Sequence, residues 1–256
     1  MGTEMKKEIH ITGQDLMNMV QLRPQDIGRY ALVPGPKERL DAILKAIKNP
    51  IKNFSFMEYS MYTGEYEGVK ITAMNGGRFA ADTAITTEIL CNAQAQTVIR
   101  LGSCGALDDQ IKIGELIVAE NAWCGEGVTP YYTQDRAWEP RADKGLTNHL
   151  YEAAKASGFK VHRGKCWSTD VILKETRANV KKATDHNCIA VDMVTSAFLT
   201  ICHQYKIPAA VILAVSDNII SGDMGFMDPN YYMAEHAMIN IALGVVKKLE
   251  GQKQTA

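Results

Sequence analysis

The sequence has no long apolar stretch and no excess of charge of one sign. None of its segments gives the run of about 18 apolar residues that a membrane-spanning helix needs, and its polar start lacks the apolar segment of a secretory signal peptide. Lysine and arginine number 28 against 29 aspartate and glutamate residues, so no strong long-range field favours nucleic acid or an anionic membrane. We therefore expect a cytoplasmic protein that acts on a small molecule, with no nucleic acid or membrane partner.

Cysteine pairs of the kind that bind zinc are also missing. The six cysteines are scattered through core-like segments without a C-x-x-C pair: Cys91, Cys104, Cys124, Cys166, Cys188 and Cys202. This spacing suggests neither a zinc site nor a disulfide framework. We expect reduced thiols, no metal and no cofactor.

What the sequence does contain is enough apolar residues for one sizeable core, 46% of 256 residues. Short β-branched runs predict buried strands at residues 30–33, 69–74, 97–101, 115–119, 189–192 and 209–215. Amphipathic stretches predict helices at residues 37–46, 80–95, 146–157, 175–184, 195–205 and 231–249. This alternation is typical of an α/β fold with a mostly parallel sheet covered on both faces. We expect a single domain over residues 1–256, with only residues 251–256 as a loose tail.

Three loops that follow predicted strands carry the candidate chemistry, because ligands of such sheets bind at the carboxyl ends of strands. In the first loop, Gly35 and the start of the next helix offer free amides to an anion, and Arg39 adds a forked cationic donor. The same sequence is also compatible with a plain turn.

The second loop follows a buried strand with the sequence Arg100-Leu-Gly-Ser103-Cys-Gly. A charged arginine there is costly unless it is paired, so Arg100 faces either an anion or a carboxylate in a structural salt bridge. In the third loop, Ser216-Asp217 closes the most apolar strand. Asp217 is a candidate general acid if burial raises its pKa, and a helix cap or a buried ion pair is the alternative.

These segments resemble the purine nucleoside phosphorylase and uridine phosphorylase family. The resemblance rests on Val33-Pro-Gly35 with Arg39, on the Arg100 to Ala106 stretch, on Val191-Asp-Met193 and on Val215-Ser-Asp217, and it extends from about His10 to Leu249. It implies one α/β domain around a mixed, partly barrel-like sheet flanked by helices. It also implies self-association as dimers that combine into hexamers.

The resemblance assigns roles to individual residues of this chain. It implies a phosphate site built from Gly35, Arg39, Arg100 and Ser103. Asp217 is similar to the aspartate that protonates the purine at N7. The implied nucleoside contacts are His10, lent by a neighbouring subunit, Trp167 stacked on the base, Met193 beneath the ribose, and Asp192, Val194 and Ser216. Inorganic phosphate is then the co-substrate.

Three positions depart from the family pattern. Val194 stands where the family has a glutamate that grips the sugar hydroxyls, which predicts weaker discrimination in favour of ribosides. Arg78 stands near the sugar in place of a methionine, and Met57 lies where hexameric members place an arginine that reaches the neighbour's phosphate site. Arg78 is therefore a further candidate for phosphate binding.

The expected function is phosphorolysis of a purine nucleoside or deoxynucleoside by a pentosyltransferase of purine salvage. Arg39 and Arg100 favour phosphate over water as the attacking group, because relatives that use water lack the arginine of the second loop. Residues 168–177 show no clear version of the glutamine and arginine pair of uridine phosphorylases. The alternatives are an N-glycosidase that uses water on a nucleoside or nucleotide, a uridine phosphorylase, and a binding or storage protein without turnover.

Overall fold

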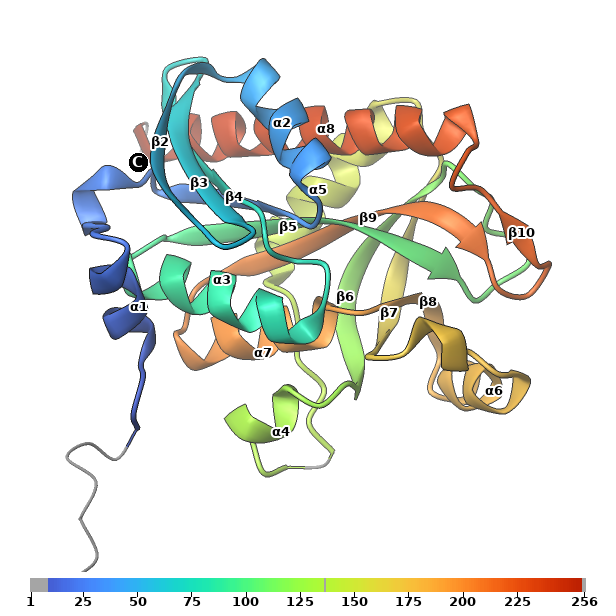
Figure 1. Ribbon diagram of the computed structural model, residues 1–256. Helices are drawn as coiled ribbons and strands as arrows, with labels where there is room; N and C mark the ends of the chain where they lie inside the picture. Colours follow the sequence, from blue (N-terminus) through green and yellow to red (C-terminus); the bar gives the residue numbers. More distant parts are fainter. Residues whose placement is uncertain (1–8, 136, 255–256) are drawn as a thin grey trace, which may run out of the picture.

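The protein is described by a computed structural model over residues 9–135 and 137–254 (Figure 1). Within these residues the strands are β1 (Tyr30–Pro34), β2 (Lys48–Phe56), β3 (Tyr59–Tyr66), β4 (Val69–Met74), β5 (Thr97–Ala106), β6 (Leu116–Gly125), β7 (Val161–Thr169), β8 (Cys188–Asp192), β9 (Ala209–Asn218) and β10 (Asp223–Met224). The α-helices are α1 (Gly13–Met19), α2 (Lys37–Ala46), α3 (Ala80–Asn92), α4 (Thr129–Tyr132), α5 (Lys144–Ala156), α6 (Arg177–Asp185), α7 (Thr195–Gln204) and α8 (Pro229–Gln254).

The strands form one mixed sheet that closes partly on itself. Its order is β10-β9-β6-β7-β8-β5-β1-β4-β3-β2, and an additional pairing joins β9 to β5. Strands β5, β9, β6, β7 and β8 thereby make a closed ring, from which β1, β4, β3 and β2 extend. The expected α/β fold with a mixed, partly barrel-like sheet flanked by helices is confirmed. The narrower expectation of a mostly parallel sheet is wrong, because antiparallel pairs such as β6 with β9 and β3 with β4 help to build it.

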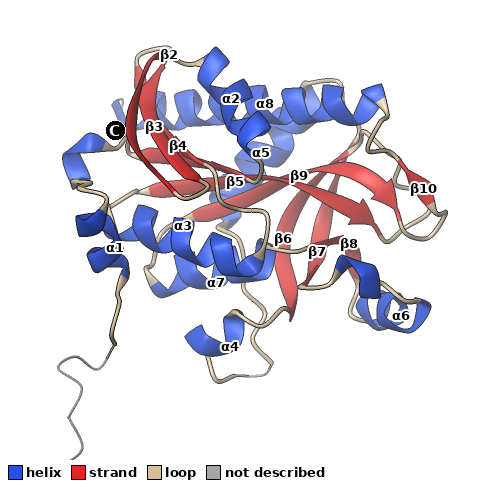
Figure 2. Cartoon of the chain, viewed as in Figure 1, coloured by secondary structure: helices blue, strands red, loops and turns tan. Residues whose placement is uncertain are grey.

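Helices cover the sheet on both faces (Figure 2). Helices α2, α5 and α8 lie on one face, and α1, α3 and α7 lie on the other. Strand β9 shows why both faces are apolar: Val211 and Leu213 pack into one core layer, while Ala210 and Ile212 pack into the other. Alternate side chains of a strand point to opposite faces, so a strand with a core on each side reads as a continuous apolar run.

The elements that the sequence did not predict lack this continuous apolar run. Strand β2 is almost entirely exposed, with Phe54 as its buried residue. Its backbone pairs with β3 all the same, so tertiary pairing rather than local patterning makes it a strand.

At the C-terminal end of the chain, helix α8 continues through residues 251–254, which were expected to be a loose tail. Residues 255–256 lie outside the described part.

No helix in the described part of the chain is both long and apolar enough to cross a membrane. The six cysteines are free thiols. Burial raises the pKa of Cys104, Cys166 and Cys202 well above the ordinary thiol value, so these thiols stay protonated and unreactive.

Candidate active site

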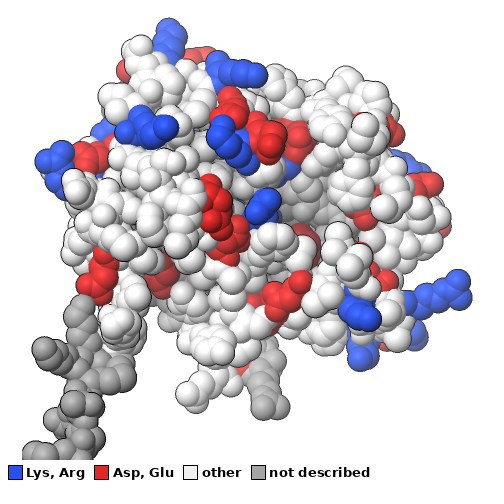
Figure 3. Space-filling view, viewed as in Figure 1, with Lys and Arg blue, Asp and Glu red and all other residues white. Residues whose placement is uncertain are grey.

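A cavity of about 210 Å³ opens at the edge where parallel strands end. Strands β1, β4, β5 and β9 are joined in parallel pairs, so their carboxyl ends meet there. The lining residues come from the loops and strand ends at this edge: Gly35, Pro36, Arg39, Gly77, Arg78, Arg100, Ser103, Cys104, Gly105, Ile172, Glu175, Val191, Asp192, Met193, Ser216, Asp217 and Phe226. In the space-filling view, the face in sight is hollowed near its centre and carries interspersed basic and acidic side chains (Figure 3).

Glycines allow the loop after β1 and the loop after β4 to touch. A Cβ atom on Gly35 would lie 3.2 Å from the carbonyl oxygen of Gly77, and a Cβ atom on Gly77 would lie only 2.7 Å from Nη1 of Arg100. Arg100 donates a hydrogen bond from Nη1 to the Gly77 carbonyl at 2.6 Å. These close approaches explain the need for residues without a side chain here. They also connect these loops to Arg100 of β5 beside the cavity.

Arg39 reaches the cavity from the first turn of α2 and is buried. It donates from Nη1 to the Leu101 carbonyl at 2.8 Å and from Nη2 to Ser103 Oγ at 2.7 Å. Nη2 also pairs with the carboxylate of Glu235, which projects from α8. Its Nε atom is buried without a hydrogen-bond partner within the described residues. The structure thus brings Gly35, Arg39 and Ser103 together, as the sequence predicts.

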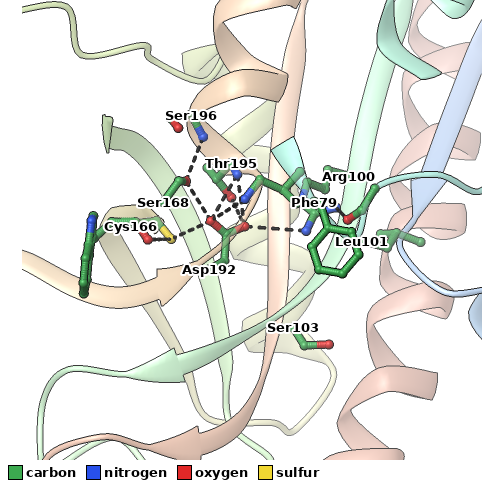
Figure 4. A network of polar contacts seen from close by, with 12 residues as sticks. Phe79, Arg100, Leu101, Ser103, Cys166, Ser168, Asp192, Thr195 and Ser196 are labelled. Carbon is green, nitrogen blue, oxygen red and sulfur yellow. Dashed lines mark hydrogen bonds and ion pairs between the residues drawn. The ribbon is translucent and has the colours of Figure 1, made fainter. Parts of the chain in front are cut away.

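The sequence left open whether Arg100 faces an anion site or a carboxylate of the protein. In the structure Arg100 borders the cavity and is also paired with a carboxylate. Its Nη2 atom lies 3.5 Å from Oδ2 of Asp192, and both side chains are buried. Figure 4 shows Asp192 at the centre of a polar network that Arg100 enters from one side. The Arg100 Nε atom has no hydrogen-bond partner among the described residues.

The Asp192 carboxylate is engaged by the protein itself, whereas the resemblance implied a nucleoside contact. It accepts hydrogen bonds from Ser168 Oγ at 2.7 Å and from Thr195 Oγ1 at 2.7 Å (Figure 4). It also accepts from the backbone N–H groups of Val194 and Thr195, at 3.1 and 3.0 Å. A carboxylate at the start of a helix satisfies free amides and favours the helix dipole. Asp192 therefore holds α7 and Arg100 in place.

Asp217 ends the apolar part of β9 and borders the cavity, where 8% of the residue is exposed. Burial raises the pKa of Asp217, and the Ser216 hydroxyl, which donates to its Oδ1 at 2.6 Å, opposes that shift. A raised pKa lets a carboxyl group keep its proton to a higher pH, which is what a general acid requires. The chemistry expected of Asp217 is therefore physically available in this cavity.

The cavity residues that the sequence analysis missed include three with side chains of chemical interest: Ile172, Glu175 and Phe226. Burial, with the negative charge of Asp217 as the second cause, raises the pKa of Glu175 to about 7. Phe226 is exposed just after β10, next to Met227 and close to the exposed Met224 of β10 itself. Such large apolar side chains in a solvent-exposed loop, directly after the Ser216-Asp217 motif, are a signal that could have pointed to the cavity.

Arg78 is exposed at the cavity and forms no salt bridge with the part of the chain that the structure describes. Its guanidinium carbon lies 5.3 Å from the centre of the Phe79 ring. The structure gives it neither an ion pair nor a hydrogen bond with any described residue, whereas Arg39 and Arg100 each face a carboxylate. Arg78 is thus the cavity cation whose charge is not already matched by a carboxylate in contact with it.

Three predicted nucleoside contacts lie away from the cavity lining. Val194 is fully buried in the apolar core at the start of α7, so its side chain does not occupy the polar pocket position that the resemblance implied. Trp167 is 5% exposed and packs in a small cluster with Leu107 and Val180. His10 is exposed near the start of the described residues. Met193 and Ser216 do line the cavity.

The described residues contain no cluster of three histidine, cysteine, aspartate or glutamate side chains that could hold a metal ion. The polar side chains that line the cavity are arginines, hydroxyl groups and carboxyl groups.

Comparisons with known proteins identify the family of the chain. A sequence profile described as Phosphorylase superfamily matches residues 29–247. A purine nucleoside phosphorylase DeoD-type from Bacillus cereus is 25% identical over 206 residues, which cover 80% of this chain and 88% of that protein. The DeoD-type enzyme of Jannaschia sp. is 28% identical over 200 residues, covering 77% of this chain and 86% of that protein.

The similar solved structures are named for uridine, whereas the relatives found by sequence are named for purine nucleosides. Uridine phosphorylase from Vibrio fischeri has a TM-score of 0.82 at 25% identity, covering 90% of this chain and 96% of that chain. A second structure of this enzyme, in complex with 6-hydroxy-1-naphthoic acid, has a TM-score of 0.81.

The profile match runs from the start of β1 into α8 and so includes every residue that lines the cavity. The expected enzyme class, pentosyltransferase, is confirmed together with the family. On its sequence, its sheet topology and its relatives, the chain belongs to the phosphorylase superfamily.

Proposed function

We propose that the protein cleaves the N-glycosidic bond of a purine nucleoside or deoxynucleoside with inorganic phosphate, giving the free base and a pentose 1-phosphate. The observation that carries this proposal is the convergence of Arg39, Arg100 and Ser103 with Asp217 on one cavity. Guanidinium groups and a hydroxyl suit a phosphate oxyanion. A carboxyl group with a raised pKa suits the departing base.

The proposed reaction divides the cavity between two ends. At the anion end, Arg39 and Ser103 hold phosphate close to C1′, and the exposed cation of Arg78 adds charge that is not already matched. The bond between C1′ and the base breaks towards an oxocarbenium-like cation, and a phosphate oxygen forms the new bond to C1′. At the other end, the proton of Asp217 passes to N7 of the base as the bonding electrons leave with it.

Asp217 supports a purine rather than uracil, because a purine offers N7 as the proton acceptor. The DeoD-type relatives support the same choice by sequence, whereas the Vibrio fischeri enzyme is named for uridine. The experiment is to compare kcat/KM for inosine, adenosine, guanosine and uridine, each with its 2′-deoxy form, at saturating phosphate. We expect purine nucleosides to exceed uridine by more than about tenfold, the range of one lost hydrogen bond to a reacting base. Faster cleavage of uridine would contradict the purine assignment.

One observation favours a second candidate, an N-glycosidase that uses water. Both buried arginines already face a carboxylate, Glu235 for Arg39 and Asp192 for Arg100, which reduces the net positive charge available to phosphate. The products separate the two reactions, because water yields a free pentose and phosphate yields a pentose 1-phosphate.

We also propose that the protein self-associates as dimers or hexamers and is located in the cytoplasm. Apolar side chains exposed near the start of the described chain, Ile9 at 62% and Ile11 at 57%, are compatible with contact to a second copy. Light scattering coupled to size exclusion measures the mass in solution, and a monomer at assay concentration would contradict this part.

A further inference from the structure

Helix α8 brings a carboxylate to Arg39 that the proposed reaction does not use. Glu235 pairs with Nη2 of Arg39, and the two side chains are 20% and 3% exposed. Tyr231, one turn earlier on the same helix, donates to Glu235 Oε1 at 2.8 Å. Tyr231 and Glu235 do not belong to the cavity lining, whereas Arg39 does, so the carboxylate reaches Arg39 from α8 and not from the cavity.

Four side chains form a closed ring of polar contacts at this point. Arg39 Nη2 donates to Ser103 Oγ at 2.7 Å, and Ser103 Oγ lies 2.8 Å from the Tyr231 hydroxyl. The ring continues from Tyr231 to Glu235 and returns to Arg39 through the ion pair. A ring of this kind fixes the guanidinium plane, because rotation of any member breaks two contacts.

The same carboxylate reduces the positive charge that Arg39 presents. An anion held against a buried guanidinium offsets its field at short range, where little solvent screens it. The oxygen of Glu235 and its charge therefore have opposite consequences for phosphate: the oxygen orients Arg39 towards the cavity, and the charge weakens the attraction of Arg39 for an anion.

We propose that Glu235 is a positioning residue that sets the phosphate affinity of the site, holding Arg39 in place while limiting how tightly phosphate and the pentose 1-phosphate product bind. This inference rests on the proposed phosphorolysis. Its consequence is that the product, which carries the same anionic group as the co-substrate, is released at a useful rate.

The test separates the oxygen from the charge by two substitutions at one position. Glu235→Gln keeps an oxygen for Tyr231 and Arg39 but removes the charge, so KM for phosphate should fall by about three- to tenfold, and kcat should fall because the product leaves more slowly. Glu235→Ala removes both, so Arg39 loses its orientation and KM for phosphate should rise by about tenfold. Glu235→Asp keeps the charge and should not lower KM.

Glu250→Gln is the matched control, because Glu250 lies on the same helix and pairs with Arg29 at 3.0 Å, away from the cavity lining. It should leave KM for phosphate unchanged. Thermal unfolding with and without inorganic phosphate gives a readout that does not need turnover: phosphate should raise the Tm of Glu235→Gln more than that of the wild type. Because each protein is compared with itself, with and without phosphate, the Tm shift remains informative for a variant that is less stable without phosphate.

The inference is overturned if Glu235→Gln and Glu235→Ala raise KM for phosphate alike, since Glu235 would then be merely structural. It is also overturned if Glu235→Asp lowers KM as Glu235→Gln does, or if Glu235→Gln leaves both KM and the phosphate-induced Tm shift unchanged. If the wild type releases base at a rate independent of phosphate, the proposed phosphorolysis itself fails. That result concerns the wild type and is distinct from a failure of the Glu235 inference, in which the wild type depends on phosphate but the variants change KM for phosphate alike.

Discussion

Arg100, within β5, and Asp192, at the end of β8, face each other with Nη2 and Oδ2 3.5 Å apart and both side chains buried. The Asp192 carboxylate is held by four further donor contacts from Ser168, Val194 and Thr195. The arginine at the anion end of the cavity is therefore anchored to the start of α7. Substitution of Arg100 should consequently affect both folding stability and phosphate kinetics.

We expect Arg100→Ala to lower the free energy of unfolding by about 3 kcal/mol, the scale for breaking a buried ion pair. Phosphate saturation should disappear as well, because the guanidinium borders the cavity. Urea unfolding and the phosphate dependence of turnover measure the two effects. Arg163→Ala is the control, since the Arg163 pair with Glu120 is partly exposed and should contribute less than about 1 kcal/mol. Survival of normal phosphate kinetics in a destabilised Arg100→Ala protein would make the ion pair purely structural.

Asp217→Asn should leave nucleoside affinity within a few fold and lower turnover by about a hundredfold or more, the usual loss for a general acid. The amide keeps the shape of the carboxyl group but has no acidic proton to give to the base. Steady-state kinetics with 6-aminopurine nucleosides measure the effect, and Asp223→Asn on the exposed strand β10 serves as control. Unchanged turnover in Asp217→Asn would remove Asp217 from the mechanism.

Glu175 should make the protein less stable as the pH rises towards neutrality. Its pKa is raised from 4.5 to about 7, so between these values the folded protein keeps a proton that the unfolded chain releases. The free energy of unfolding then falls from about pH 4 to about pH 7 and stays level above. Glu175→Gln removes this dependence, so its Tm should exceed that of the wild type by more at about pH 8 than at about pH 5. A Tm difference that is constant over this pH range would show that Glu175 titrates normally.

Val194→Glu should destabilise the protein rather than improve ribosides as substrates. Val194 is fully buried in the apolar core, so the glutamate would place a carboxyl group among apolar side chains. Val194→Ala provides the comparison and should cost about 2 kcal/mol through the cavity that it leaves, with the glutamate costing more. If Val194→Glu kept its stability and raised kcat/KM for ribosides, its side chain would reach the substrate, as the family resemblance first suggested.

The sequence was sufficient to predict those helices and strands whose local pattern of apolar residues matches their burial in the fold. The expected helix at residues 37–46 matches α2, and the buried runs predicted β1 and β4 closely. It was not sufficient for β2, whose exposed residues carry no alternating pattern and which depends on pairing with β3. It also did not reveal the pairing of β9 with β5 that closes the barrel, because register between distant strands has no local signature.

The candidate site was predictable where motifs lie in, or shortly after, the strands that meet at the cavity. Gly35 and Arg39 follow β1, Arg100 and Ser103 lie within β5, and Asp217 lies near the end of β9; all five line one cavity. The place of Val194 in the apolar core was not predictable, because a resemblance fixes the position of a residue but not the direction of its side chain. Glu235 was missed because its partner Arg39 is 196 residues away in sequence, and a single carboxyl group on α8 is a weak local signal.

The central claim is that the arginines of this cavity hold phosphate for attack on the sugar. The most direct test is to measure base release from inosine as a function of phosphate concentration and to quantify the sugar product by phosphorus NMR. The account predicts that the rate saturates with phosphate and that one pentose 1-phosphate forms for each base released. Base release at the same rate without phosphate, with free pentose as the product, would contradict it.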